Sequence, residues 1–91
     1  MITGFRHNGL KRFCERGDES RITAAYRTKV RRILTALDSA RSPDDLRMDW
    51  GLHALSGNLK GFWSVTVSRN WRIIFRFADK NVCDVDLIDY H

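Results

Sequence analysis

The sequence predicts an α+β fold in which two N-terminal helices pack on a small antiparallel sheet. Three observations support this prediction. Apolar residues recur at spacings of three and four between positions 26 and 37, which is typical of a helix. Between positions 62 and 88 they alternate with polar residues, which is the period of a strand. The helical signals all precede the main strand signals, and 91 residues suffice for one domain with one core, which we assign to residues 1–91.

The first third of the chain predicts an extended segment and two helices. Residues 2–5 are expected to form an edge strand or an added strand of the sheet. A short helix should start at Asn8 and end at Gly17, because glycine suits a helix C-cap. We expect Ser20 or Thr23 to cap the main helix. Its buried face is predicted to carry Tyr26, Val30, Ile33, Leu34 and Leu37.

The segment between the main helix and the sheet predicts short elements. Residues 38–41 break the helix, and Ser42-Pro43 is typical of an N-cap followed by proline in a first helical turn. Residues 48–55 are less regular, and Trp50 and Leu52 are expected to begin a first strand. Residues 56–58 predict a turn.

Three clear strands follow, and their apolar faces nearly fix the register, since a one-residue slip would turn every side chain over. We expect Trp63 to lie opposite Phe75 and Val65 opposite Ile73. On the next pair of strands, Trp71 should face Leu87 and Phe75 should face Cys83. The outer face is then predicted to carry Ser64, Thr66, Arg72, Asp84 and Asp86, with Arg72 between Thr66 and Asp86.

Composition excludes several classes of protein. No apolar run approaches the roughly 20 residues of a membrane span, and the N-terminus lacks a signal-peptide pattern, so we expect a cytoplasmic protein without membrane contact. Cys14 and Cys83 are expected to be buried, reduced thiols rather than a disulfide. No spacing of cysteine and histidine indicates zinc, and the sequence predicts neither a metal nor a cofactor.

The positive charge is concentrated in the N-terminal half. The formal net charge is +5, yet residues 1–47 hold 11 Lys and Arg against 6 Asp and Glu, while residues 48–91 hold 5 of each. The main helix has no acidic residue before Asp38, and it carries Arg27, Lys29, Arg31 and Arg32. A helix of one sign attracts polyanions such as nucleic acid. A solvated face, or a seat for an acidic partner, explains the charge equally well.

Polar groups gather near the end of the chain in a combination suited to cutting RNA. They are Asn70, Arg72, Asp86, Asp89, Tyr90 and His91. Cleavage of an RNA phosphodiester needs a group that accepts the 2′-hydroxyl proton, a group that protonates the leaving 5′-oxygen, and a cation beside the charged phosphorane. Imidazole suits the proton transfers, guanidinium suits the phosphate, and a tyrosine can stack on a base. The alternative is a frayed terminus beside a surface ion pair of Arg72 with Asp86.

Four segments of the chain resemble the HigB toxins of the RelE/ParE superfamily. They are residues 5–13 (FRHNGLKRF), residues 52–65 (LHALSGNLKGFWSV), residues 70–77 (NWRIIFRF) and the final Asp89-Tyr90-His91. Their order and spacing to the terminus make the joint pattern specific. The resemblance implies a compact, microbial-ribonuclease-like fold and a toxin that cleaves mRNA in the ribosomal A site. It also implies a helix-turn-helix antitoxin of the HigA type, whose complex with the toxin would bind operator DNA.

The resemblance also assigns roles to residues. Asp89, Tyr90, His91 and Arg72 would form the catalytic cluster, while Asn70, His53 and Lys60 would help to hold RNA. The basic helix with Arg27, Lys29, Arg31 and Arg32 would dock on 16S ribosomal RNA. One departure stands out: many HigB sequences have a lysine before the glycine of the second segment, where this chain has Ser56. We therefore expect a weaker stabilisation of the transition state.

Two other functions remain open at this stage. A ParE-like toxin of the same fold would inhibit DNA gyrase, although the Asp-Tyr-His ending favours a nuclease. A catalytically weak module that binds RNA or the antitoxin would retain the fold without the chemistry. Cleavage of mRNA on translating ribosomes distinguishes the nuclease from both.

Overall fold

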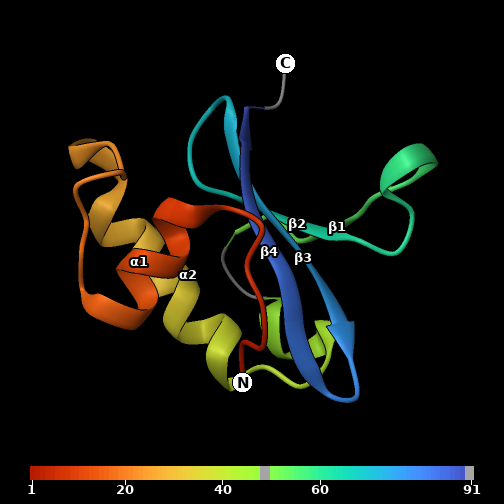
Figure 1. Ribbon diagram of the computed structural model, residues 1–91. Helices are drawn as coiled ribbons and strands as arrows, with labels where there is room; N and C mark the ends of the chain where they lie inside the picture. The colour runs from red at the N-terminus through yellow and green to blue at the C-terminus, as the bar shows by residue number, and fades with distance from the viewer. Residues whose placement is uncertain (48–49, 90–91) are drawn as a thin grey trace.

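The protein consists of a helical layer packed on one face of an antiparallel sheet (Figure 1). The computed structural model describes residues 1–47 and 50–89. The four strands are hydrogen-bonded in the order β1-β2-β3-β4. The main elements are α1 (Asn8–Arg16), α2 (Arg27–Ser39), β1 (His53–Ala54), β2 (Trp63–Thr66), β3 (Trp71–Ala78) and β4 (Asn81–Asp89). The α+β prediction is confirmed.

The N-terminal segment joins the free edge of β4, as expected for residues 2–5. Ile2 and Phe5 form parallel bridges with Val82 and Val85. The backbone N–H of Thr3 donates to the carbonyl of Val82 at 2.7 Å. These bonds cover an edge that would otherwise expose unpaired backbone groups.

Helix α1 has a cap at each end. At its start the Nδ1 atom of His7 accepts a hydrogen bond from the backbone N–H of Leu10 at 3.0 Å. At its end Gly17 takes the left-handed conformation with φ 68°, as predicted. The ends of α1 are therefore set by local sequence.

The predicted cap of the main helix is wrong. Thr23 precedes a short 3₁₀ turn, Ala24–Tyr26, and α2 begins only at Arg27. Neither Thr23 nor Tyr26 caps its helix with a side-chain hydrogen bond. Four of the five residues predicted for the buried face, Val30, Ile33, Leu34 and Leu37, are buried. The fifth, Tyr26, precedes α2 and is half-buried against the core.

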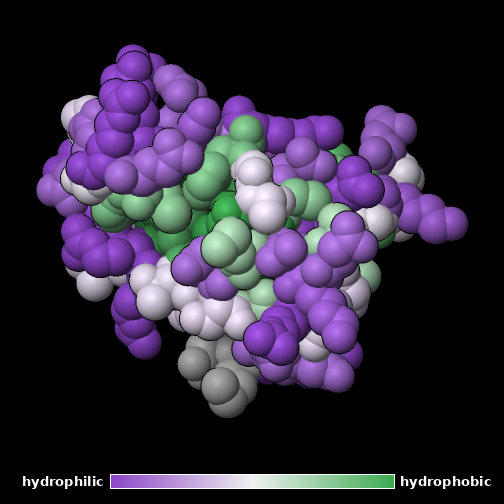
Figure 2. Space-filling model, turned by 60° about the horizontal axis from the view of Figure 1, so that its bottom comes forward, coloured by the Kyte–Doolittle hydropathy of each residue, from purple (hydrophilic) through white to green (hydrophobic). Residues whose placement is uncertain are grey.

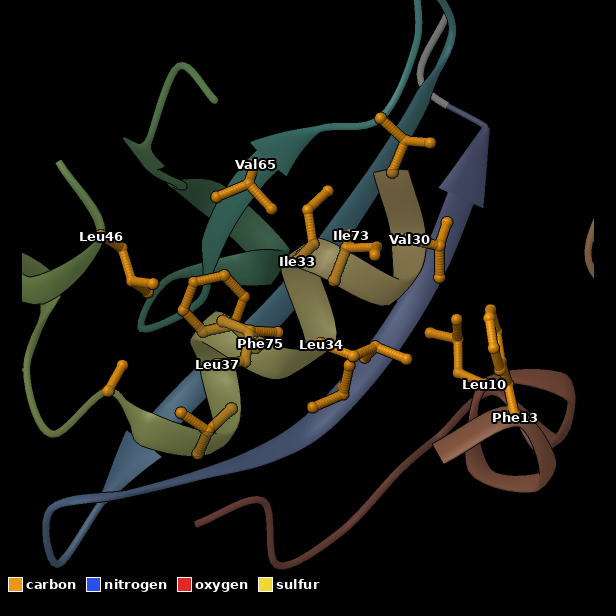
Figure 3. Close-up of a cluster of buried hydrophobic side chains, with 14 of the residues drawn as sticks. Leu10, Phe13, Val30, Ile33, Leu34, Leu37, Leu46, Val65, Ile73 and Phe75 are labelled. Atoms are coloured by element: carbon orange, nitrogen blue, oxygen red, sulfur yellow. The ribbon is translucent and has the colours of Figure 1, made fainter. Parts of the chain in front are cut away.

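The core lies between α2 and the inner face of the sheet (Figure 3). Val65, Ile73 and Phe75 project from the strands towards the side of α2 that carries Ile33. Phe75, Ile33 and Ile73 have no exposed surface. Leu10 and Phe13 of α1 extend this core on one side, and Leu46 of the 3₁₀ turn Pro43–Leu46 extends it on the other. Burial of this apolar face, rather than helix propensity, holds the two layers together.

The register of β2 with β3 is as predicted, whereas that of β3 with β4 is not. Trp63 lies opposite Phe75 and Thr66 opposite Arg72. On the other side, Trp71 lies opposite Asp89 rather than Leu87. Asp86 faces Ile74, so the expected pairing of Arg72 with Asp86 is wrong, and Arg72 faces Ile88 instead.

The difference has two causes, each worth one residue. The two-residue turn Asp79-Lys80 pairs Ala78 with Asn81, and an irregularity of the ladder between Ile74 and Arg76, opposite Asp84, adds the second shift. Asp84 has φ 53°, a left-handed conformation that aspartate tolerates better than most residues. The extra residue places Val82 and Val85 in the core. Cys83 lies on the turn side of this irregularity, so its position opposite Arg76 instead of Phe75 comes from the two-residue turn.

The prediction of two buried thiols is also wrong: Cys14 is exposed and Cys83 is half-buried, although both are free as expected. On the face that Figure 2 shows, apolar surface appears near the centre and hydrophilic side chains surround it. No helix within residues 1–47 and 50–89 is long and apolar enough to cross a membrane.

Candidate functional site

A pocket of about 350 Å³ lies on the outer face of the sheet, the face that the helices leave uncovered. Its floor comes from β2 and β3, and its wall comes from β1 and the 3₁₀ turn Gly57–Leu59. The side chains that line it are those of His53, Ala54, Leu55, Ser56, Leu59, Ser64 and Arg72. Two of the predicted site residues, His53 and Arg72, therefore meet in one pocket.

Arg72 is the cation of this pocket. It is half-buried on β3, and its Nη1 donates a hydrogen bond to the Oγ1 of Thr66 at 3.2 Å. Thr66 is the residue directly opposite it on β2, as the sequence predicted. A guanidinium held in this way presents a fixed pattern of N–H donors, which matches the oxygens of a phosphate.

Asp89 lies near Arg72 in the register of the sheet. Asp89 is the last residue of β4, is exposed, and pairs with Trp71, next to the pair of Arg72 with Ile88. Because side chains alternate along a strand, Asp89 projects towards the face opposite to that of Arg72, at the very end of the sheet. The predicted catalytic residues Tyr90 and His91 follow it in sequence and lie outside the described residues.

Of the other predicted site positions, Ser56 lines the pocket, whereas Asn70 and Lys60 do not. Asn70 is exposed in the turn between β2 and β3, directly before the paired strand begins. Lys60 is exposed at the end of the 3₁₀ turn Gly57–Leu59 and does not line the pocket. Ser56 does line it. The position at which this chain departs from the expected lysine is therefore part of the pocket wall.

Sequence reasoning missed the buried character of one further residue. Ser64 lies on the outer face as predicted, directly opposite His53, but it has no exposed surface. Its Oγ is buried and has no hydrogen-bond partner within the described part of the chain. Alternation of apolar and polar residues could not reveal this burial, because it depends on the tertiary position of the segment 53–59, which lines the same pocket.

The basic residues of α2 are not part of this pocket. The helix covers the opposite face of the sheet (Figure 1). Glu19 forms ion pairs with Arg27 at 3.6 Å and with Arg31 at 3.2 Å, and the guanidinium of Arg31 also lies 5.4 Å from the ring centroid of Phe13. Lys29 is half-buried and Arg32 is exposed. Within the predicted basic surface, Arg27 and Arg31 therefore already interact with Glu19, and Arg31 also with Phe13.

Two groups in the helical layer have shifted pKa values. Hydrogen bonds from the side chain and backbone of Ser20 hold the pKa of Asp18 below its usual range. Desolvation raises the pKa of the Cys14 thiol, and the charges of Asp38 and Glu15 raise it further. Cys14 lines a second hollow of about 440 Å³ between α1 and α2, away from the residues of the outer face. Its raised pKa makes it a poor nucleophile.

Comparison with known proteins identifies the family. A family model described as a RelE-like toxin of the type II toxin–antitoxin system HigB matches residues 3–91. The chain is 38% identical over 92 residues to a Proteus vulgaris protein named endoribonuclease HigB, and the match covers 100% of both chains. It is 34% identical over 82 residues to toxin HigB-1 of Vibrio cholerae serotype O1, with 87% of this chain and 86% of that one covered.

A solved structure supports the same fold. The chain is similar to the structure of the YoeB dimer from Staphylococcus aureus, with a TM-score of 0.60 and 18% sequence identity. The superposition covers 99% of this chain and 94% of the other. At this identity the likeness concerns the fold alone.

Proposed function

The chain belongs to the HigB-like family of toxins from type II toxin–antitoxin systems, and from this membership we propose that it is an endoribonuclease that cleaves mRNA in the ribosomal A site. The full-length match to a protein named endoribonuclease HigB supports the nuclease activity. The observation on this chain that carries the proposal is the position of Arg72, held by Thr66 in a pocket that it shares with His53.

The chemistry follows from the residue types and needs no metal. A base removes the proton of the 2′-hydroxyl, which attacks the adjacent phosphorus and expels the 5′-oxygen of the next nucleotide, and an acid protonates that oxygen. The products are a 2′,3′-cyclic phosphate and a 5′-hydroxyl. We assign one proton transfer to His91, its orientation to Asp89, stacking on a base to Tyr90, and stabilisation of the phosphorane charge to Arg72.

The other expected contacts are assigned by position. His53 lines the pocket, Lys60 follows the 3₁₀ turn whose Leu59 lines it, and Asn70 directly precedes β3; these three residues would hold the RNA. On α2, Arg27, Lys29, Arg31 and Arg32 would contact 16S ribosomal RNA from the other side of the sheet, and Arg31 and Arg32 are exposed. A toxin of this kind acts with an antitoxin, here of the HigA type, whose complex with the toxin would bind operator DNA.

Ser56 predicts a modest catalytic rate. It lines the pocket where a lysine would add a second cation beside the phosphate. Loss of one positioned donor costs about 10²–10³ in rate in other enzymes. We therefore expect Ser56→Lys to speed cleavage, and a slower Ser56→Lys variant would contradict this role for the position.

The proposal is tested on one defined mRNA, either free or bound in programmed ribosomes with the A site empty. We expect cuts within the A-site codon of the bound mRNA only. The upstream fragment should end in a 2′,3′-cyclic phosphate and the downstream fragment should start with a 5′-hydroxyl. Equal cutting of free mRNA would contradict ribosome dependence, and fragments with 5′-phosphate ends would contradict the acid–base mechanism.

A further inference from the structure

The outer-face pocket contains a hydroxyl whose hydrogen-bonding capacity the fold does not use. Ser64 is fully buried, and its Oγ is the only buried side-chain nitrogen or oxygen without a partner within residues 1–47 and 50–89. Native proteins bury few such groups, and each one calls for an explanation. Alanine would fill this position without leaving an unpaired group, so packing alone does not explain the serine.

The walls around Ser64 combine apolar and polar groups. Leu55 and Leu59 are half-buried and line the pocket, and the charged side chain of Arg72 lines it as well. The volume of about 350 Å³ is near the lower end of the range of about 300–1,000 Å³ found for small-ligand sites. The pocket therefore suits a single planar ring with an attached anion, rather than a folded RNA or a peptide.

We propose that this pocket holds one nucleobase of the RNA and that the Ser64 hydroxyl hydrogen-bonds to its edge. The inference rests on the proposed function, which supplies RNA as the substrate class. A hydroxyl both donates and accepts, so it can bond to the edge of any of the four bases. The leucines contact the face of the ring, and Arg72 contacts the phosphate of the same nucleotide.

The segment that lies beside Ser64 in the sheet is suited to admit a base. Strand β1 has two residues, His53 and Ala54, both exposed, and the 3₁₀ turn after it has three. A backbone bond from Leu55 N–H to the carbonyl of Phe62, 2.9 Å long, ties the segment to the start of β2. So short an element opens at low cost, and a small outward shift brings the Ser64 Oγ into contact with a ligand.

The test is a binding titration of the native protein and of Ser64→Ala with the four nucleoside 5′-monophosphates and with ribose 5-phosphate. We expect at least one nucleotide to bind the native protein more tightly than ribose 5-phosphate does. Ser64→Ala should raise the Kd of that nucleotide about two- to ten-fold, the effect of one hydrogen bond, without changing the Kd of ribose 5-phosphate. Ser64→Cys keeps a side chain of similar shape but offers only a weak hydrogen-bond donor, so it should weaken binding similarly.

Thermal stability distinguishes a ligand-binding role of the Ser64 hydroxyl from a purely structural one. Ser64→Ala removes an unpaired buried group, so its Tm should equal or exceed that of the native chain, whereas a structural hydroxyl would lower the Tm on removal. Ser39→Ala, at the exposed end of α2, serves as the serine control and should leave every Kd unchanged.

The inference is overturned if nucleotides bind no better than ribose 5-phosphate, if Ser64→Ala leaves the nucleotide Kd unchanged, or if it weakens ribose 5-phosphate equally. These outcomes need no ribosome. Failure of the proposed function would instead appear as intact mRNA in programmed ribosomes while nucleotide binding persists.

Discussion

Replacement of Arg72 by alanine should separate catalysis from stability. The substitution removes one hydrogen bond to Thr66, 3.2 Å long, from a half-buried side chain. A hydrogen bond from a charged donor contributes about 1.5–3 kcal/mol to folding, which is less than the typical stability of about 5–15 kcal/mol for a domain. Loss of a positioned charge beside the phosphorane should raise the barrier by about 2.7–4 kcal/mol, or about 10²–10³ in rate.

Arg76→Ala is the matched control, because Arg76 lies on the same strand and face, four residues further along. Its guanidinium contacts Asp84 at 3.3 Å and lies 5.7 Å from the ring centroid of Phe62, and its side chain is 48% exposed. Such an exposed pair contributes about 0–1 kcal/mol to stability. Arg76→Ala should therefore fold normally and cleave at the native rate.

The assay is single-turnover cleavage of mRNA in programmed ribosomes, together with urea unfolding of each variant. A folded Arg72→Ala variant within a few-fold of the native rate would refute the assignment of the phosphate to Arg72. Equal losses in Arg72→Ala and Arg76→Ala would also refute it, because the effect would then reflect the general positive charge of the strand rather than one position.

Three further predictions concern stability and reactivity. Lys80→Gly should raise the free energy of unfolding by about 0.5–1 kcal/mol, because Asp79 and Lys80 have φ of 52° and 65° in the tight β3–β4 turn; a lower urea midpoint would contradict this. Gly9→Ala should lower the free energy of unfolding by about 1–3 kcal/mol, since a Cβ at this position would lie 2.8 Å from the Cβ of Arg21 and from Cε1 of His7. Gly4→Ala, whose Cβ would meet nothing closer than 4.0 Å, is its control, and equal urea midpoints would refute the clash. Iodoacetamide near pH 8 should modify Cys14 more slowly in the native chain than in urea, because its raised pKa leaves less thiolate; equal rates by mass spectrometry would argue against the shift.

Much of the fold could be predicted because its signals are periodic and local. The alternation from Trp63 to Phe77 fixed the register of β2 with β3, since any slip would expose the core face. The error in β4 came from two shifts of one residue each. The first lies at the two-residue turn Asp79-Lys80, which places Cys83 opposite Arg76. The second lies at Asp84, which adopts a left-handed conformation without being glycine, and aspartate on a strand gives no distinctive sign of a bulge.

The candidate site could be predicted only in part. Its residues come from the paired strands β2 and β3 and from the irregular segment 53–59, which lines the same pocket. The pairing of Arg72 with Thr66 followed from alternation alone. The burial of Ser64 depends on the position of the segment 53–59, which has little periodic signal. The basic face of α2 was read from composition, yet the acidic Glu19 that pairs with Arg27 and Arg31 lies outside the helix and is distant in sequence.

The central claim is that Asp89, Tyr90 and His91 perform the chemistry together with Arg72. The most direct measurement maps the 5′ ends of a defined mRNA after adding the native protein, or a chain that lacks His91, to programmed ribosomes. The account predicts cuts within the A-site codon for the native chain and their loss without His91, with ribosome binding retained. Cuts of equal strength from both chains would contradict it, as would ribosome binding without any cleavage by the native protein.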